Sequence, residues 1–119
     1  MIKISKLLIF LLFVFIIIAP QKTLANQKLK IGLLIPLSKD NQEIGQLIIN
    51  TVRMAINDIN NESIEIIVKD TKSNPNNTLK SAIELKNENV KIVIGPVFYQ
   101  NIVNLGEVED LIFLSLTNR

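Results

Sequence analysis

Apolar residues are arranged along the chain in two alternating patterns. Leu29 to Pro36 (LKIGLLIP) is an almost continuous apolar run, which is typical of a strand buried on both faces of a parallel sheet. Three later runs are short and rich in isoleucine, valine and leucine, and they predict further strands. These are Ile64 to Lys69, Val90 to Ile94, which ends at Gly95-Pro96, and Leu111 to Leu116.

The stretch after the first strand has helical spacing instead. Asp40 followed by Glu43 has the form of a capping box, so the first helix is expected to start there. Asn60-Asn61 is expected to end it. The apolar positions between recur at offsets of three and four and predict a buried stripe, not a membrane-binding face. They are Ile44, Leu47, Ile48, Val52, Ala55, Ile56 and Ile59.

A second helix is predicted after the polar loop 70–77. Asn74 is a good N-cap and Pro75 suits the first helical position, and the helix should run to Glu88. Its buried stripe is expected to hold Leu79, Ala82, Ile83 and the stem of Lys86. A short helix over Ile102 to Val108 is also expected, although Gly106 weakens it.

The resulting order, β-α-β-α-β-α-β, predicts an α/β fold with an open parallel sheet and helices on both faces. Crossovers of this length suit such units. The last strand would be an apolar edge without a covering helix, which is an aggregation liability. We therefore expect residues 26–119 to form an incomplete domain, the beginning of a larger one.

The N-terminus has the pattern of a secretory signal. Lys3 and Lys6 precede the apolar run Leu7 to Ala19, Pro20 ends it, and Ala25 supplies a small residue for cleavage. A spanning helix needs about 20 apolar residues, so the run is short for one. We expect residues 1–25 to be a cleaved signal peptide and the rest to be exported to the periplasm; an uncleaved membrane anchor is the alternative.

Composition narrows the function further. The formal charge is +2, but without the three lysines of the leader ten basic residues face eleven acidic ones, so no basic patch points to nucleic acid. The chain has no histidine and no cysteine, which removes the commonest general base, thiolate chemistry, disulfides and a lipoprotein cysteine. We expect a protein that is not an enzyme and has no cofactor and no metal site.

Four motifs in order resemble type I periplasmic binding proteins of the leucine-binding kind. They are Ile31 to Ser38 (IGLLIPLS), the following helix with Gly45 and Ala55, Val68 to Lys72 (VKDTK), and Ile92 to Phe98 (IVIGPVF). The resemblance covers about Leu29 to Asn118. It implies part of the first of two lobes, joined by a hinge around a ligand cleft.

Two functions follow from this resemblance. One is a solute-binding protein that passes a small polar ligand, such as an amino acid, to the membrane permease of an ABC transporter. The other is a penicillin-binding protein activator, which uses the same fold to regulate a cell-wall synthase. Two features favour the activator. The short turn Ile59 to Ile64 replaces a Gly-Gly hairpin that is common in transport proteins, and Tyr99 and Gln100 stand where relatives that hold an amino acid carry Ser or Thr. The lack of a lipoprotein cysteine counts against the outer-membrane lipoprotein form of the activator.

The predicted ligand-binding residues are Ser38, Tyr99, Gln100 and Thr117. All follow strand carboxyl ends, where open α/β sheets bind their ligands near the point at which strand order reverses. The strand order implied by the resemblance puts that point between the first and third strands. A plain turn role for Ser38 and packing of Tyr99 on a helix are the alternatives. Asp70 is interpreted as a residue that caps its loop, in preference to a ligand contact.

Overall fold

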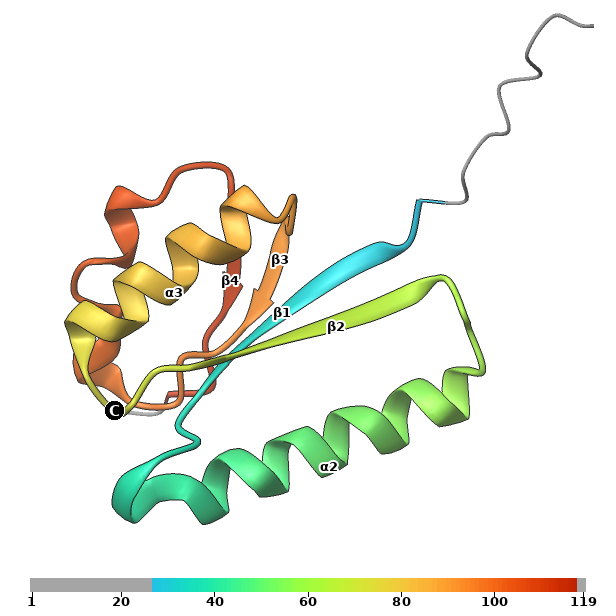
Figure 1. The fold of residues 1–119 in the computed structure, drawn as a ribbon, viewed down its shortest axis with the longest axis horizontal. Coiled ribbons are helices and arrows are strands. Elements are labelled where there is room, and N and C mark those ends of the chain that lie inside the picture. Colours follow the sequence, from blue (N-terminus) through green and yellow to red (C-terminus); the bar gives the residue numbers. More distant parts are fainter. Residues whose placement is uncertain (1–26, 118–119) are drawn as a thin grey trace, which may run out of the picture.

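The computed structural model describes residues 27–117, which form one four-stranded sheet with a long helix on either side (Figure 1). The predicted signal peptide, its cleavage site and Asn118 lie outside the described residues. Nine elements follow one another over these residues, and the four strands and two α-helices among them come in the predicted order. They are β1 (Leu29–Ile35), η1 (Lys39–Asn41), α2 (Gln42–Ile59), β2 (Ile64–Asp70), α3 (Pro75–Asn87), β3 (Ile92–Ile94), η2 (Tyr99–Ile102), η3 (Leu105–Glu107) and β4 (Ile112–Leu114).

All strand pairs in the sheet are parallel, and the order is β2-β1-β3-β4. β1 pairs with β2 over its whole length, from Leu29 opposite Ile64 to Ile35 opposite Asp70. β3 pairs with β1 on one side and with β4 on the other. The predicted α/β class, the open parallel sheet and the helices on both faces are confirmed.

The inner strand β1 contributes side chains to two hydrophobic cores, because its side chains alternate between the two faces of the sheet. Leu33 and Ile35 point toward α2 and pack with its buried Ile49. Leu34 points the other way and packs with Ala82 and further residues under α3. Continuous apolar sequence in β1 is thereby explained, since both faces of this strand are covered.

Helix α2 begins later than predicted, and the capping box does not form. Asp40 lies in the 3-10 turn η1, and Asn41 occupies the N-cap without a side-chain cap hydrogen bond. The Asn41 amide donates instead to the Ser73 hydroxyl at 3.0 Å, which links this turn to the loop after β2. The helix ends as predicted at Asn60, which adopts a left-handed conformation.

The predicted buried stripe of α2 is only partly right. Ile49, which the stripe omitted, is buried, and Ile48, Val52 and Ile56 are half-buried. Leu47 and Ile59 are 67% and 61% exposed, and Ile44 and Ala55 are also exposed. The sequence periodicity was read as fully buried, but the described sheet covers only one side of this stripe.

Helix α3 begins as predicted. The Asn74 side chain accepts hydrogen bonds from the backbone of Asn76 and Asn77, and Pro75 is the first helical residue. Of the predicted stripe, Ala82 is buried and Leu79 half-buried, whereas Ile83 and Lys86 are exposed. Leu85 fills the core in their place, beside Gly32 of β1, where a Cβ atom would lie 2.7 Å from a Leu85 methyl group.

The third and fourth strands are shorter than their apolar runs. Val90 is buried before β3 begins, with its N–H bonded to the carbonyl of Leu85 at the end of α3. Leu111 and Leu116 likewise flank β4. The single helix expected over 102–108 is instead two 3-10 turns, η2 and η3, and Gly106 lies in the second. As expected, β4 is an edge strand, and Ile112 and Leu114 are exposed.

Candidate ligand-binding edge of the sheet

The carboxyl ends of all four strands meet at one edge, because every pair is parallel. The chain moves outward from β1 to β2 and then crosses back to β3 on the other side of β1. Strand order therefore reverses between β1 and β3, as predicted. Crevices outside such a switch point are where open α/β sheets bind ligands.

Asp70 organises the β1 side of this edge. Its Oδ1 atom accepts hydrogen bonds from the backbone N–H groups of Leu37 and Lys72, both at 2.8 Å. Partial burial works against the charged form, but these two hydrogen bonds, together with the Ser38 hydroxyl and the charge of Lys72, outweigh it and hold the pKa of Asp70 below its usual value. Its interpretation as a loop cap is confirmed: Asp70 fixes the loop that carries Ser38.

Ser38 follows directly on this tethered loop and is half-buried. Its Oγ atom is enclosed, and no partner lies within hydrogen-bond geometry among the described residues. The hydroxyl still lowers the pKa of Asp70, so the two side chains are neighbours. A buried hydroxyl without a partner is rare in folded proteins, and a ligand or a water molecule normally supplies one.

Close packing behind Ser38 sets the course of its loop. Gly45 in the first turn of α2 lies against Pro36, and a Cβ atom there would come 1.8 Å from the Pro36 carbonyl oxygen. Only glycine permits this approach. The start of α2 is thereby held at the carboxyl end of β1.

The β3 side of the edge is built on Gly95. This residue has φ of +111° and donates its N–H to the carbonyl of Leu114 at 2.9 Å. The positive φ and the nearby Leu34 carbonyl, which a Cβ atom would meet at 2.2 Å, both require glycine. The chain then enters η2, where Tyr99 and Gln100 are exposed; at 58% exposure the Tyr99 side chain is not packed into a helix interface.

Thr117 follows β4 at the same edge. The Leu116 N–H donates to the Pro96 carbonyl at 3.1 Å, which holds the end of β4 against the loop that leads to Tyr99. Thr117 is half-buried, and its Oγ1 atom accepts a hydrogen bond from the Ser115 hydroxyl at 3.3 Å. The structure thus brings the loops of Thr117 and Tyr99 together and puts Ser38 in the loop after β1, the neighbour of β3. No hydrogen bond between described residues joins any two of the four predicted side chains.

Sequence reasoning missed one polar side chain here. Asn101 is 1% exposed, and neither atom of its side-chain amide has a hydrogen-bond partner among the described residues. Its backbone N–H bonds to the carbonyl of Phe98. An asparagine that follows Tyr99-Gln100 in a polar loop is typical of an exposed position, so no signal in the sequence indicated that Asn101 is buried.

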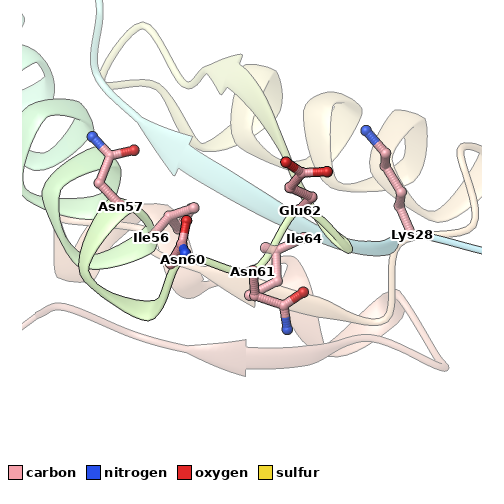
Figure 2. Close-up of a pocket in the computed structure, with 7 residues that line it drawn as sticks. All are labelled: Lys28, Ile56, Asn57, Asn60, Asn61, Glu62 and Ile64. Carbon is pink, nitrogen blue, oxygen red and sulfur yellow. The ribbon is translucent and has the colours of Figure 1, made fainter.

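A hollow of about 580 Å³ lies elsewhere, at the amino end of the sheet (Figure 2). It is formed by the end of α2 and the segments that lead into β1 and β2. Figure 2 shows Asn61 pointing away from Glu62 and Lys28, so the polar side chains that line the hollow do not converge on one point. For this reason we place the candidate site at the carboxyl edge of the sheet and not in this hollow. The hollow is lined by Lys28, Ile56, Asn57, Asn60, Asn61, Glu62 and Ile64.

Residues 27–117 hold neither a cluster of acidic side chains that suits a metal ion nor a membrane-spanning helix. There, no three acidic side chains come together as a group that could hold a metal ion. No helix in the same range is both long enough and apolar enough to cross a membrane.

An open parallel sheet with its switch point between β1 and β3 has the architecture of a lobe of a type I periplasmic binding protein. Residues 28–113 match the family model described as "Periplasmic binding protein". This is most of the chain, and the chain therefore belongs to the periplasmic binding protein family. None of the curated proteins matches it.

Solved structures show the same fold. The leucine-binding protein LivK of Thermotoga maritima is 17% identical with a TM-score of 0.69, and the match covers 76% of this chain and 28% of LivK. A solute-binding protein of an ABC transporter from Rhodopseudomonas palustris, solved with 3,4-dihydroxybenzoic acid, is 23% identical with a TM-score of 0.68, over 76% of this chain and 27% of that one. At these identities the likeness shows the fold alone.

The C-domain of LpoA from Haemophilus influenzae, a regulator of PBP1A, is 28% identical with a TM-score of 0.57. That match covers 76% of this chain and 28% of the LpoA domain. The chain thus spans little more than a quarter of the length of the structures it resembles.

Proposed function

We propose that the carboxyl edge of the sheet holds a small polar ligand, such as an amino acid, in an exported binding protein that serves an ABC transporter. The observation that carries this proposal is the enclosed, unpartnered hydroxyl of Ser38 at the switch point. Membership of the family supports it, and the fold is one that a leucine-binding protein and a solute-binding protein of an ABC transporter also have. The part assigned to the chain is binding and not catalysis.

Each predicted residue has a part in this proposal. The Ser38 hydroxyl donates to, or accepts from, a polar group of the ligand, while Asp70 keeps its loop in place through Leu37. Tyr99 offers a ring face and a hydroxyl with few rotamers to immobilise, and Gln100 offers a donor and an acceptor. Thr117 adds a hydroxyl from the neighbouring loop.

Calorimetric titration with a panel of amino acids and aromatic acids, leucine and 3,4-dihydroxybenzoate included, tests the proposal. Once a ligand is found, Ser38→Ala, Tyr99→Ala and Gln100→Ala should each weaken it. Loss of one buried hydrogen bond costs about 1–3 kcal/mol, which corresponds to a roughly five- to hundred-fold loss of affinity.

The matched control is Asn57→Ala, which removes an exposed amide at the far end of the molecule and should leave the affinity unchanged. A ligand that binds as tightly to all three edge variants as to the parent would show that the edge is not the site.

A second function is favoured by the sequence identity to LpoA, which exceeds that to the two transport proteins. In this alternative the exposed side chains of Tyr99 and Gln100 contact a peptidoglycan synthase instead of a solute. A chain that binds nothing in the panel but retains a purified penicillin-binding protein, and loses it with Tyr99→Ala, would establish the regulator.

A further inference from the structure

Asn101 occupies a position where the neighbouring core has apolar side chains. In the segment after β3, Asn101, Leu105 and Val108 recur at offsets of four and three, and all three are buried. Leu105 and Val108 pack beneath α3 in one cluster with Ala82 and Leu85. Asn101 is the first member of the same inward-facing row, and it carries a polar amide where an aliphatic side chain is usual.

The described residues themselves enclose this amide. The turn η2, which carries Asn101, lies against α3 (Figure 1). Both Nδ2 and Oδ1 of Asn101 are shut off from solvent, and neither atom has a hydrogen-bond partner among residues 27–117. Structure from any other part of the protein would add cover over these atoms, and it could not reach them without displacing η2. The unpaired amide is therefore a property of this part of the fold.

An amide in this setting needs a partner that can both donate and accept hydrogen bonds. The side chain of Asn101 has two N–H donors and a carbonyl acceptor. Burial removes its hydration, so an amide without a partner destabilises the fold, whereas a leucine of similar size would be buried without that cost. The great majority of buried side-chain polar atoms in folded proteins are paired with protein atoms or with ordered water.

The depth of Asn101 distinguishes it from Ser38, the other residue with an enclosed and unpartnered side-chain atom. Ser38 is half-buried in the loop at the carboxyl edge, whereas Asn101 is 1% exposed. A solute as large as an amino acid would have to displace η2 to reach the amide. A water molecule is small enough to be enclosed, and buried waters typically make about three hydrogen bonds to polar groups that the protein leaves unpaired.

We propose that Asn101 binds one enclosed water molecule between η2 and α3, and that this hydration site holds the turn that presents Tyr99 and Gln100. Asn101 is then a positioning residue of the candidate site, because it contacts the water and not the solute. The hydration site stands on the burial and chemistry of Asn101. Its effect on ligand binding rests in addition on the proposed function.

The backbone around Tyr99 shows why such an anchor matters. At the start of the loop, the Leu116 N–H donates to the Pro96 carbonyl at 3.1 Å and ties the loop to the end of β4. At its end, the Asn101 N–H donates to the Phe98 carbonyl at 3.0 Å. This second bond lies within the turn, so it shapes η2 without tying it to α3. The hydrated side chain of Asn101 supplies that tie.

A high-resolution crystal structure of the exported protein tests the hydration site itself. It is solved without ligand, and again with the best ligand of the panel. One ordered water molecule within hydrogen-bond distance of Asn101 Nδ2 and Oδ1 is expected in both structures. An Asn101 amide that bonds directly to protein atoms would overturn the proposal, and so would an atom of the ligand in place of the water.

Fluorescence of Tyr99 tests the positioning role, because this chain has one tyrosine and no tryptophan. Asn101→Leu keeps the size of the side chain but removes both polar atoms, so it should loosen η2 and lower the fluorescence anisotropy of Tyr99. Asn101→Ser retains a hydroxyl that can hold the water, and its anisotropy should lie closer to that of the parent. Asn104→Leu makes the same change three residues later, at a half-buried site without a side-chain cap hydrogen bond, and should have no effect.

Ligand affinity gives the last measurement. With a ligand of the panel, Asn101→Leu should weaken binding about five- to tenfold, as expected when one polar contact of the ligand is misplaced, while Asn104→Leu binds like the parent. A parent that binds nothing in the panel would remove the proposed function, and the crystal structure and the fluorescence would still decide the hydration site. Circular dichroism checks that each variant folds, and the crystal structure of the parent needs no variant. Anisotropy and affinity equal to those of the parent in a folded Asn101→Leu would overturn the positioning role.

Discussion

At the scale of single residues, the carboxyl edge depends on a few polar groups held by the backbone. The Asp70 carboxylate satisfies two backbone donors, one on its own loop and one on the loop of β1. Ser38 beside it has a hydroxyl without a partner. Asp70 therefore positions the edge, and Ser38 beside it is the residue that we propose to contact a ligand.

The first prediction concerns Asp70 and pH. Because the pKa of Asp70 is lowered in the folded chain, its contribution to stability is present above the ordinary aspartate pKa and is lost as pH falls through the folded value. Asp70→Ala should cost about 1–3 kcal/mol at pH 7, since the donors of Leu37 and Lys72 lose their acceptor. Urea unfolding at several pH values measures both effects.

Asp70→Asn is the matched variant, because its amide oxygen still accepts hydrogen bonds but carries no charge. It should lose less stability than Asp70→Ala at neutral pH, and its stability should depend less on pH at the acid end. If Asp70→Ala and the parent unfold at the same urea concentration, the loop does not depend on this carboxylate.

At the scale of elements, local signals predicted the fold well. Asn74 with Pro75 gave the start of α3, and the apolar runs gave all four strands within a few residues. The predictions that failed concern features that depend on tertiary contacts. Periodicity alone shows that α2 is amphipathic, but not that the described sheet leaves one apolar side uncovered, so Leu47 was wrongly predicted to be buried.

The start of α2 and the burial of Asn101 were missed for a similar reason. Asp40 and Glu43 fit a capping box, yet a 3-10 turn held near Ser73 takes up the residues before Gln42. Burial of Asn101 depends on how η2 packs against α3. No residue pattern within either segment carries that information.

A prediction at this scale concerns the cap of α3. Asn74→Ala removes the acceptor of two backbone N–H groups and should destabilise the chain by about 1 kcal/mol, while Asn74→Asp should retain most of the stability. Asn104→Ala is the control, because Asn104 precedes η3 without a side-chain cap hydrogen bond. Thermal unfolding followed by circular dichroism compares them; equal losses for Asn74→Ala and Asn104→Ala would refute the role of the cap.

At the scale of the whole molecule, the chain is a member of the periplasmic binding protein family that spans about a quarter of the structures it resembles. The fold and the position of the switch point are the parts that the sequence motifs predicted correctly. Strand topology brings the four residues proposed as the site to one edge of the sheet, although no local motif in the sequence identifies a ligand.

Export is predicted from residues outside the described range. The leader should be cleaved after Ala25, so mass spectrometry of protein secreted with its own leader should give Asn26 as the first residue. Recovery of the chain with Met1 to Ala25 intact in the membrane fraction would favour an anchor instead.

The central claim is that a small ligand binds at the carboxyl edge of the sheet. Nuclear magnetic resonance tests it most directly, by following the chemical shifts of the backbone amides as ligand is added. With the best ligand of the amino-acid and aromatic-acid panel, we predict saturable shifts at Ser38, Tyr99, Gln100 and Thr117. Asn61 and Glu62 at the amino end should not move and provide the internal control. Saturable shifts at Asn61 and Glu62 with none at the carboxyl edge would contradict the account.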